Sequence, residues 1–170
     1  MHAAAHDYVA RQLAHEHPFT CVVEVGGRDI NGGVTHLLRL AEHGWYWSID
    51  LEPGPGVDEV ADARAWSPPP QHDPELVLCC EVLEHAPDPA GVVKAMASWL
   101  RPGGLLLVTA AGPGRAVHSG HHGGPLAPGE YYGNVDPDDL TRWLEDAGLR
   151  EVQVHYAPGP CDVYARAVAP

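Results

Sequence analysis

Acidic residues lie at or near the ends of four short apolar runs in this 170-residue chain. These acids are Glu24, Asp50, Asp62 and Glu81. A carboxylate at the end of a strand can accept hydrogen bonds from both hydroxyl groups of a ribose, and Asp50, which ends the second run, is well placed to do so. Each acid alone could equally cap a turn, so the acids have to be considered together with the glycines beside them.

A glycine-rich segment, residues 26–33 with the sequence GGRDINGG, follows the first apolar run at 22–25. Glycine allows the backbone to turn with positive φ and lets a ligand approach without a Cβ in the way. A glycine loop at the end of a strand is weak evidence by itself, because many such loops are only turns. Together with the acids it predicts a ligand site at one edge of a sheet.

Side chains able to exchange protons gather in residues 110–135, which have no apolar period and therefore predict a long loop, typical of a lid over a substrate. Together with one residue after the fourth apolar run, the candidate acids and bases are His85, His118, His121, His122, Tyr131 and Tyr132. Each could instead be a surface or packing residue. The spacing of His118, His121 and His122 also allows a zinc site, but no carboxylate or cysteine evidently completes it, so we assign no metal site.

The elements that must position these residues follow from the apolar patterns. Strands are expected at 22–25, 45–50, 59–61, 76–80 and 105–109, with a hairpin at 152–156 and 161–168. Helices are expected in the N-terminal segment 1–18, at 34–41 with a stop at Gly44, after the cap Asp88 and after the cap Asp136. Strands and helices alternate until the final hairpin, which predicts an α/β fold.

The composition predicts a single domain, residues 1–170, that is soluble and cytoplasmic. The formal net charge is −13 with only 10 Lys and Arg residues, which argues against a nucleic-acid partner. The four cysteines show no C-x-x-C spacing, so reduced thiols are expected. No window resembles a membrane span or the core of a signal peptide.

Taken in order, these pieces resemble a class I S-adenosylmethionine-dependent methyltransferase of the small, type 11-like kind. The resemblance rests on EVGGRDINGG, SIDLEPGPGVD, ADA, LVLCCEVLEH, LRPGGLLLVT and the terminal hairpin, and it covers residues 21–168. It implies a Rossmann-like, doubly wound sheet of seven strands in the order 3-2-1-4-5-7-6, with strand 7 antiparallel. It also implies S-adenosylmethionine as cofactor and S-adenosylhomocysteine as product.

The resemblance also implies roles for individual residues. Glu24 and the loop residues Gly26, Gly27, Arg28 and Asn31 match the motif that wraps the methionine part of the cofactor. The remaining matches are Asp50 for the ribose, Leu51 for the adenine ring, Asp62 with Ala63 for the adenine amino group, and Glu81 near the methionine end. The family's usual G-x-G-x-G is replaced here by a longer, polar loop.

The expected reaction is transfer of a methyl group to an oxygen or nitrogen atom of a small molecule. The Asn/Asp-Pro-Pro-Tyr signature of amino-methylating DNA enzymes and the Pro-Cys of cytosine C5 enzymes are both absent after the fourth apolar run. Two alternatives stay open: a non-catalytic module that binds the same cofactor or its product, and, less in keeping with the hairpin, an NAD-binding oxidoreductase. The chain is short, so the long loop, the N-terminal helix or a second subunit, as in a homodimer, has to complete the pocket.

Overall fold

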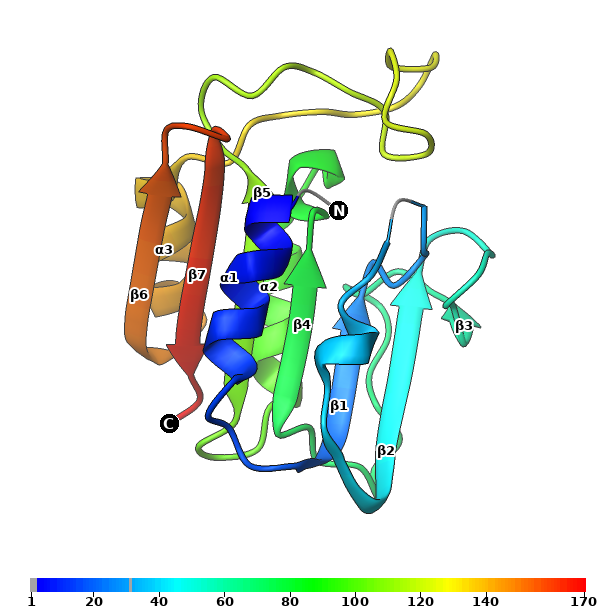
Figure 1. Cartoon of the computed structure of the whole chain (residues 1–170), viewed down its shortest axis with the longest axis vertical. Helices are drawn as coiled ribbons and strands as arrows, with labels where there is room; N and C mark the ends of the chain where they lie inside the picture. The colour runs from blue at the N-terminus through cyan, green and yellow to red at the C-terminus, as the bar shows by residue number, and fades with distance from the viewer. Residues whose placement is uncertain (1–2, 31) are drawn as a thin grey trace.

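The computed structural model describes residues 3–30 and 32–170, and in this part of the chain seven strands form one sheet (Figure 1). The strands are β1 (Phe19–Val25), β2 (Leu40–Asp50), β3 (Glu59–Val60), β4 (Leu76–Cys80), β5 (Leu105–Ala111), β6 (Arg150–Ala157) and β7 (Asp162–Val168). Their order across the sheet is β3-β2-β1-β4-β5-β7-β6. This order confirms the topology that the resemblance implies.

The directions of the strands also agree with the prediction. β7 runs antiparallel to both β5 and β6, whereas the pairs that join β3, β2, β1, β4 and β5 are parallel. Val22 to Val25 of β1 lie in register with Tyr46 to Ile49 of β2 on one side and with Leu76 to Cys79 of β4 on the other. The carboxyl ends of these strands therefore meet at one edge of the sheet, where open α/β sheets bind ligands.

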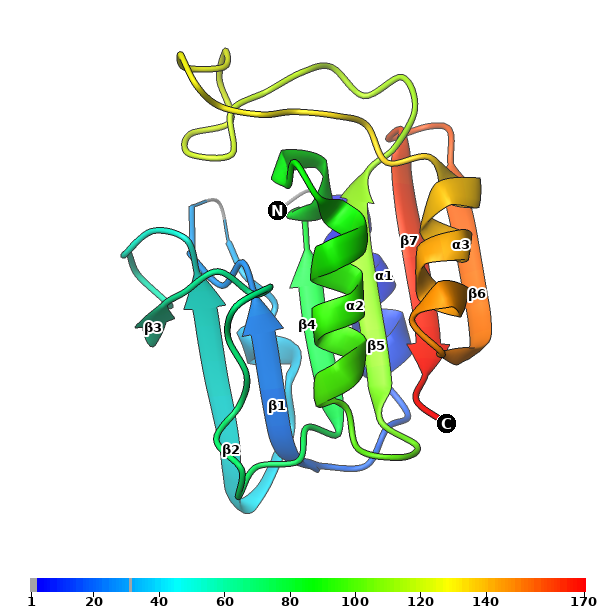
Figure 2. The same ribbon diagram turned by 180° about the vertical axis from the view of Figure 1, so that it is seen from behind.

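Helices cover both faces of the sheet. Helix α1 (Ala3–Leu13) lies on the face seen in Figure 1, and helices α2 (Pro89–Trp99) and α3 (Pro137–Asp146) lie on the face seen in Figure 2. All residues of β4 are buried, and alternate side chains join the two cores: Leu76 and Leu78 pack on the α1 side, Val77 and Cys79 on the α2 side. A continuous apolar run is what a parallel strand covered on both faces requires.

The helix predicted for residues 34–41 was wrong. The chain there forms a single 3-10 turn, η1 (Thr35–Leu37), and then enters β2 at Leu40. By Arg39 the backbone is already back at the start of β1, where the Arg39 carbonyl accepts a hydrogen bond from the Phe19 N–H at 2.8 Å. Residues 34–39 would span only about 9 Å as an α-helix, whereas the seven residues of β1 extend about 23 Å. The short connection therefore has to run extended.

The helix starts on the other face agree with the capping signals. The Asp88 side chain accepts a hydrogen bond from the Gly91 N–H, and the Asp136 side chain accepts one from the Asp138 N–H, with proline in the first turn of each helix. Helix α1 ends at Leu13, five residues before the end of the predicted N-terminal segment 1–18. Residues 1 and 2 of the predicted N-terminal helix lie outside the described residues.

The long loop predicted from residues 110–135 begins after Ala111, where β5 ends, and has no helix or strand before α3. It passes over the carboxyl ends of the strands in both Figures 1 and 2. Its start is anchored by Arg115, whose guanidinium donates to Asp162 at 2.7 Å and to the Pro160 carbonyl at 2.9 Å. Within the loop, the Ser119 hydroxyl donates to Glu130 at 2.6 Å. These bonds give the loop a fixed course above the sheet edge.

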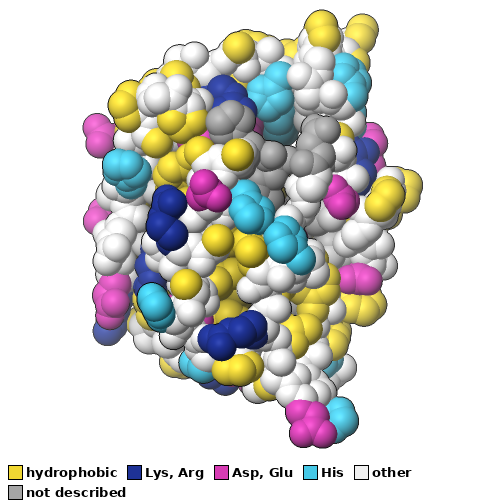
Figure 3. Space-filling view, viewed as in Figure 1, with side chains coloured by type: hydrophobic (Ala, Val, Ile, Leu, Met, Phe, Trp, Pro, Cys, Tyr) yellow, Lys and Arg dark blue, Asp and Glu magenta, His cyan; other side chains and the backbone are white. Residues whose placement is uncertain are grey.

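The surface of the α1 face shows no continuous basic patch. In Figure 3 the Lys and Arg side chains of this face are scattered among acidic, histidine and apolar side chains. Among the described residues, none of the helices has the length and apolar character that crossing a membrane would need.

Candidate functional site

Four neighbouring parallel strands bring acidic side chains to the same edge of the sheet. Glu24 is the penultimate residue of β1, and Asp50 ends β2. Asp62 lies two residues after the end of β3, and Glu81 follows β4 directly. Because these strands are adjacent in the order β3-β2-β1-β4, the four acids form a row along that edge. The sequence-predicted acids are thus brought together by the topology.

Packing against β2 and β4 requires glycine at the start of the loop after β1. The N–H groups of Gly26 and Gly27 both donate to the Ile49 carbonyl, at 2.8 and 3.3 Å. A Cβ at Gly26 would overlap the Val82 side chain, and one at Gly27 would overlap the Ser48 hydroxyl. Gly26 also has φ of 78°, the left-handed region that favours glycine. These two glycines therefore let the loop lie tightly between two strand ends.

Asp50 is held by the backbone on both of its oxygens. Oδ2 accepts from the Arg28 N–H at 3.3 Å, and Oδ1 accepts from the Glu52 N–H at 3.0 Å. Each carboxylate oxygen can accept a further hydrogen bond, so the group is oriented and still able to bind two hydroxyls. The next side chain, Leu51, is 69% exposed and offers an apolar surface beside Asp50. Asn31, also predicted to bind cofactor, lies outside the described residues.

Asp62 is engaged by a neighbour rather than left open. Arg64 donates to Asp62 from its backbone N–H and from its guanidinium, at 2.7 to 3.1 Å. These hydrogen bonds from Arg64 hold the pKa of Asp62 below its usual range. The adjacent Ala63 is buried in the core on the α2 side. A ligand at Asp62 would have to share this carboxylate with Arg64.

Glu24 is buried beneath the glycine loop, where two hydroxyl groups of the described residues are its side-chain partners. Its Oε2 accepts a hydrogen bond from the Tyr46 hydroxyl at 2.6 Å and a longer one from the Thr35 hydroxyl at 3.4 Å. Burial raises the pKa of Glu24 above its ordinary value of 4.5, although both hydroxyls oppose this shift. The carboxyl fixes the positions of β2 and η1 relative to β1.

This raised pKa predicts a pH-dependent stability. A carboxyl whose pKa is higher in the folded state binds its proton more tightly there, so its contribution to stability falls as the pH rises from its ordinary pKa to its folded value. We expect Glu24→Gln to lose this fall, so that its unfolding free energy at pH 8, relative to its value at pH 4.5, is higher than in the unaltered chain. Urea unfolding at several pH values measures this, with exposed Glu42→Gln as the matched control. Equal pH profiles for Glu24→Gln and the unaltered chain would refute it.

Glu81 stands at the switch from β4 into the following turn. Its backbone has φ of 58°, which is rare for a residue other than glycine. The Glu81 N–H donates to the Thr109 carbonyl at 2.8 Å, and the Thr109 hydroxyl donates to the Glu81 carboxylate at 2.9 Å. Partial burial raises the pKa of Glu81. The strained backbone aims this carboxylate across β5, and such strain is often found at functional sites.

Three of the candidate acids and bases meet above β4. The rings of His85, His118 and Tyr132 pack edge to face, with centroids 5.0 to 5.5 Å apart. His85 belongs to the 3-10 turn η2 (Leu83–His85), and the other two come from the long loop. Burial, assisted by repulsion from His118, lowers the pKa of His85 to about 4, so its ring is neutral at physiological pH. This cluster encloses the side of the site beyond β4.

The other candidates on the loop lie apart from that cluster. The His121 ring lies 3.1 Å from the Arg28 guanidinium, 3.3 Å from Glu52 and 3.2 Å from Glu130. Arg28 itself binds Glu52 at 2.6 Å and donates to the Gly120 carbonyl at 3.3 Å. The Arg28 side chain thus ties the glycine loop to the long loop.

The rings of His122 and Tyr131 are exposed and lie outside the aromatic cluster, although the Tyr131 backbone lies against the His85 ring. The His122 ring accepts a hydrogen bond from the Gly124 N–H at 3.1 Å, which is a contact within its own turn. The side chain of Tyr131 is 45% exposed. The three closely spaced histidines, His118, His121 and His122, therefore lie in three different environments.

Sequence reasoning missed one residue that shapes the site, Glu84. Glu84 is fully buried beneath His85, and neither of its carboxylate oxygens has a hydrogen-bond partner among the described residues. Burial, with repulsion from Glu81, raises the pKa of Glu84 well above its ordinary value. The spacing E-x-x-E-H at 81–85 was the available signal, but burial of an acid in a turn cannot be seen in the sequence.

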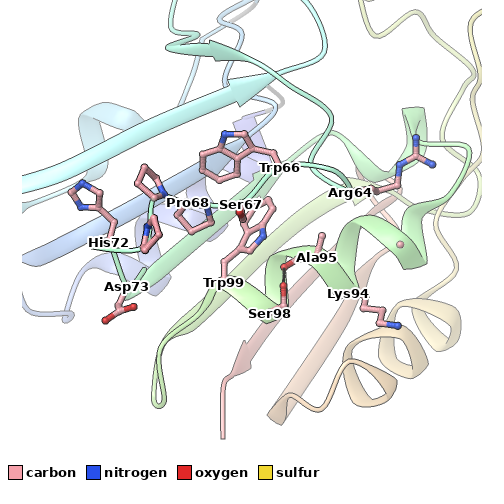
Figure 4. Close-up of a pocket in the computed structure, with 13 residues that line it drawn as sticks. Arg64, Trp66, Ser67, Pro68, His72, Asp73, Lys94, Ala95, Ser98 and Trp99 are labelled. Carbon is pink, nitrogen blue, oxygen red and sulfur yellow. Dashed lines mark hydrogen bonds between the residues drawn. The ribbon is translucent and has the colours of Figure 1, made fainter.

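The surface pocket drawn in Figure 4 is lined by Arg64, the partner of Asp62. It has a volume of about 510 Å³ and lies between the segment 64–73 and helix α2. Trp66, Trp99 and the prolines at 68–70 form its apolar walls, and Trp66 meets Trp99 edge to face. None of the four strand-end acids lines it.

Comparison with known proteins gives the site a family context. A family model described as a methyltransferase domain matches residues 1–154. The chain is 36% identical over 129 residues to a ubiquinone biosynthesis O-methyltransferase of Xylella fastidiosa, covering 68% of this chain and 49% of that protein. A Serratia proteamaculans protein of the same name is 29% identical over 161 residues, covering 88% and 62%. The chain thus spans about half the length of the curated relatives it matches.

Solved structures share the fold at low identity. A Burkholderia thailandensis 1,6-didemethyltoxoflavin-N1-methyltransferase with bound S-adenosylhomocysteine superposes with a TM-score of 0.67 at 15% identity, covering 98% of this chain and 78% of that one. A Haemonchus contortus phosphoethanolamine N-methyltransferase 2 gives 0.68 at 13% identity, covering 99% and 53%. With the family model matching most of the chain, the topology and the row of acids place this protein among the class I S-adenosylmethionine-dependent methyltransferases, in the methyltransferase domain family.

Proposed function

We propose that this chain binds S-adenosylmethionine and transfers its methyl group to a small-molecule acceptor, releasing S-adenosylhomocysteine. The row of acids at the ends of β3, β2, β1 and β4, beside a glycine loop packed between two of these ends, is the observation that carries the proposal. Relatives and structural neighbours named as methyltransferases support it.

The residues at this edge fit the parts of that cofactor. Asp50, held in place by two backbone N–H groups, would receive the two ribose hydroxyls. The exposed Leu51 offers an apolar surface for the adenine ring, with Asp62 and Ala63 beyond it. The loop from Gly26 would take the methionine part, and Glu81 would lie near its charged end.

The cofactor, when bound, supplies a methyl group already activated on a sulfonium sulfur. The chain has to orient the acceptor, exclude water and receive a proton from a hydroxyl or ammonium acceptor. His85, His118 and Tyr132 enclose the space beyond β4, and the loop at 112–136 forms a lid over it. The names of the relatives favour an acceptor hydroxyl.

We further propose that the protein works in the cytoplasm, where its free cysteines would stay reduced, and that a second copy completes the pocket as a homodimer. Light scattering of the purified protein tests the second statement. A molar mass of one chain at working concentrations would overturn it.

Calorimetric titration with S-adenosylmethionine and with S-adenosylhomocysteine tests the cofactor assignment. A panel of phenols, catechols and amines, scored by release of S-adenosylhomocysteine, then tests transfer. We expect micromolar binding of both cofactor forms and release with at least one hydroxyl acceptor. Binding with no release across the panel would favour a non-catalytic module, and preferential binding of NAD would overturn the proposal.

A further inference from the structure

Two imidazoles and a carboxylate converge above the end of β4. Glu84 and His85 come from η2, and His118 comes from the long loop. Their ligand atoms all lie within 4.8 Å of one another. Two segments separated by more than thirty residues of chain thus bring three metal-binding side chains to one point.

Glu84 has no side-chain hydrogen-bond partner among the described residues, although the backbone N–H groups of Glu84 and Ala111 lie close to its buried carboxylate. Its side chain has no exposed surface. The Tyr132 hydroxyl, also buried against this cluster, is likewise without a partner in the described part of the chain. Buried polar groups are normally satisfied, so two such groups at one point indicate that something binds between them.

The local charge balance favours a cation as the missing partner. Glu84 is repelled by Glu81, and Glu81 is repelled by Asp162. The Arg115 side chain attracts both Glu81 and Glu84. The Arg115 guanidinium is already bound to Asp162 at 2.7 Å. A divalent cation beside Glu84 would face acidic side chains whose nearby positive side chain, Arg115, is already engaged by Asp162.

The surroundings of the histidines suit metal ligation. The His118 Nδ1 lies 3.0 Å from the Ala116 carbonyl, which assigns the proton to Nδ1 and leaves the Nε2 lone pair available. Metal-bound histidines commonly donate their second N–H to a backbone carbonyl in this way. At Gly120 the loop backbone comes so close to His85 that a Cβ there would lie 3.0 Å from the ring. The loop therefore packs directly on the cluster.

We propose that Glu84, His85 and His118 bind one divalent cation of the zinc class and that this metal joins the long loop to the end of β4. Two imidazoles and one carboxylate form a donor set that zinc and similar transition metals accept, with further positions open to a substrate oxygen. Magnesium is disfavoured, because it prefers oxygen ligands alone. The binding claim is independent of the methyl donor; only a role in holding an acceptor hydroxyl rests on the proposed function.

Cobalt(II) is the probe for this site, because its visible absorption reports ligation directly. The protein is used without a histidine tag and with His36→Ala, since His6 and His36 lie 3.0 Å apart at the surface and could bind metal themselves. We expect one Co²⁺ per chain, displaced by one equivalent of Zn²⁺ and not by Mg²⁺. Glu84→Gln and His118→Ala should each weaken binding at least tenfold.

His122→Ala is the matched control, since His122 lies on the same loop and outside the cluster. It should bind Co²⁺ as tightly as the parent protein. Absence of a visible band, or equal affinity in His118→Ala, would overturn the proposal, provided circular dichroism shows each variant folded. Titration with S-adenosylhomocysteine, run on the same samples without metal, measures cofactor binding independently of metal binding. A failure of the metal proposal can therefore be distinguished from a failure of the proposed function.

Discussion

Asp50→Ala is expected to weaken S-adenosylhomocysteine binding by about 100-fold or more while leaving the fold intact. A carboxylate that accepts hydrogen bonds from two ribose hydroxyls makes two charge-assisted bonds, each worth about 1.5 to 3 kcal/mol. Their joint loss of about 3 kcal/mol corresponds to roughly 100-fold in affinity. Asp50 is partly exposed at the end of β2, so removing its side chain leaves no cavity in the core. Calorimetric titration of both proteins measures the difference.

Two further variants separate ribose binding from general charge effects. Asp50→Asn keeps the shape and the acceptor oxygen but loses the charge, so we expect it to bind with intermediate affinity. Asp146→Asn removes one negative charge from the exposed end of α3, far along the sequence from the site, and should bind as the unaltered chain does. Unchanged affinity in Asp50→Ala would mean that the ribose does not contact this acid.

The central strands were predictable because a strand that is buried on both faces requires an uninterrupted run of apolar residues. The run at 76–80 is uninterrupted and matches β4 residue for residue, and the caps Asp88 and Asp136 precede helices as expected. The segment 34–41 misled because apolar residues at helical spacing also occur in a short extended connection. There the distance that the chain had to cover decided the conformation, and only the pairing of Phe19 with Arg39 reveals that distance.

The row of acids was predictable for a similar reason: parallel strands place their carboxyl ends at one edge whatever their lengths. The contacts made by the long loop could not be predicted from the sequence. Loop side chains have no period from which to infer neighbours, so the separation of His118 from His121 and the burial of Glu84 depend on tertiary packing alone. The same holds for the pairing of Arg115 with Asp162, which are distant in sequence and belong to different elements.

Arg115→Met is expected to be the most destabilising of the substitutions considered, lowering the free energy of unfolding by about 3 kcal/mol. Asp162 has no exposed surface, and the Arg115 guanidinium binds it at 2.7 Å. Methionine keeps the length of the side chain but not the charge, so the buried carboxylate loses the positive charge of Arg115. The Tyr164 hydroxyl, which donates to Asp162 at 2.9 Å, cannot replace a positive charge. Urea unfolding followed by tryptophan fluorescence measures the change.

A double variant tells whether the cost arises from the buried charge or from the lost anchor of the loop. In Arg115→Met with Asp162→Leu both charges are gone, and apolar replacements of a buried ion pair are often nearly neutral. If the charge causes the loss, the double variant should recover at least half of the stability that Arg115→Met loses. If the anchor matters more, because Arg115 also donates to the Pro160 carbonyl, the double variant should stay as unstable as the single one.

Tyr164→Phe, which removes one hydrogen bond and no charge, should cost only about 1 kcal/mol. Equal losses in Tyr164→Phe and Arg115→Met would contradict the prediction, because the ion pair would then contribute no more than a single neutral hydrogen bond does.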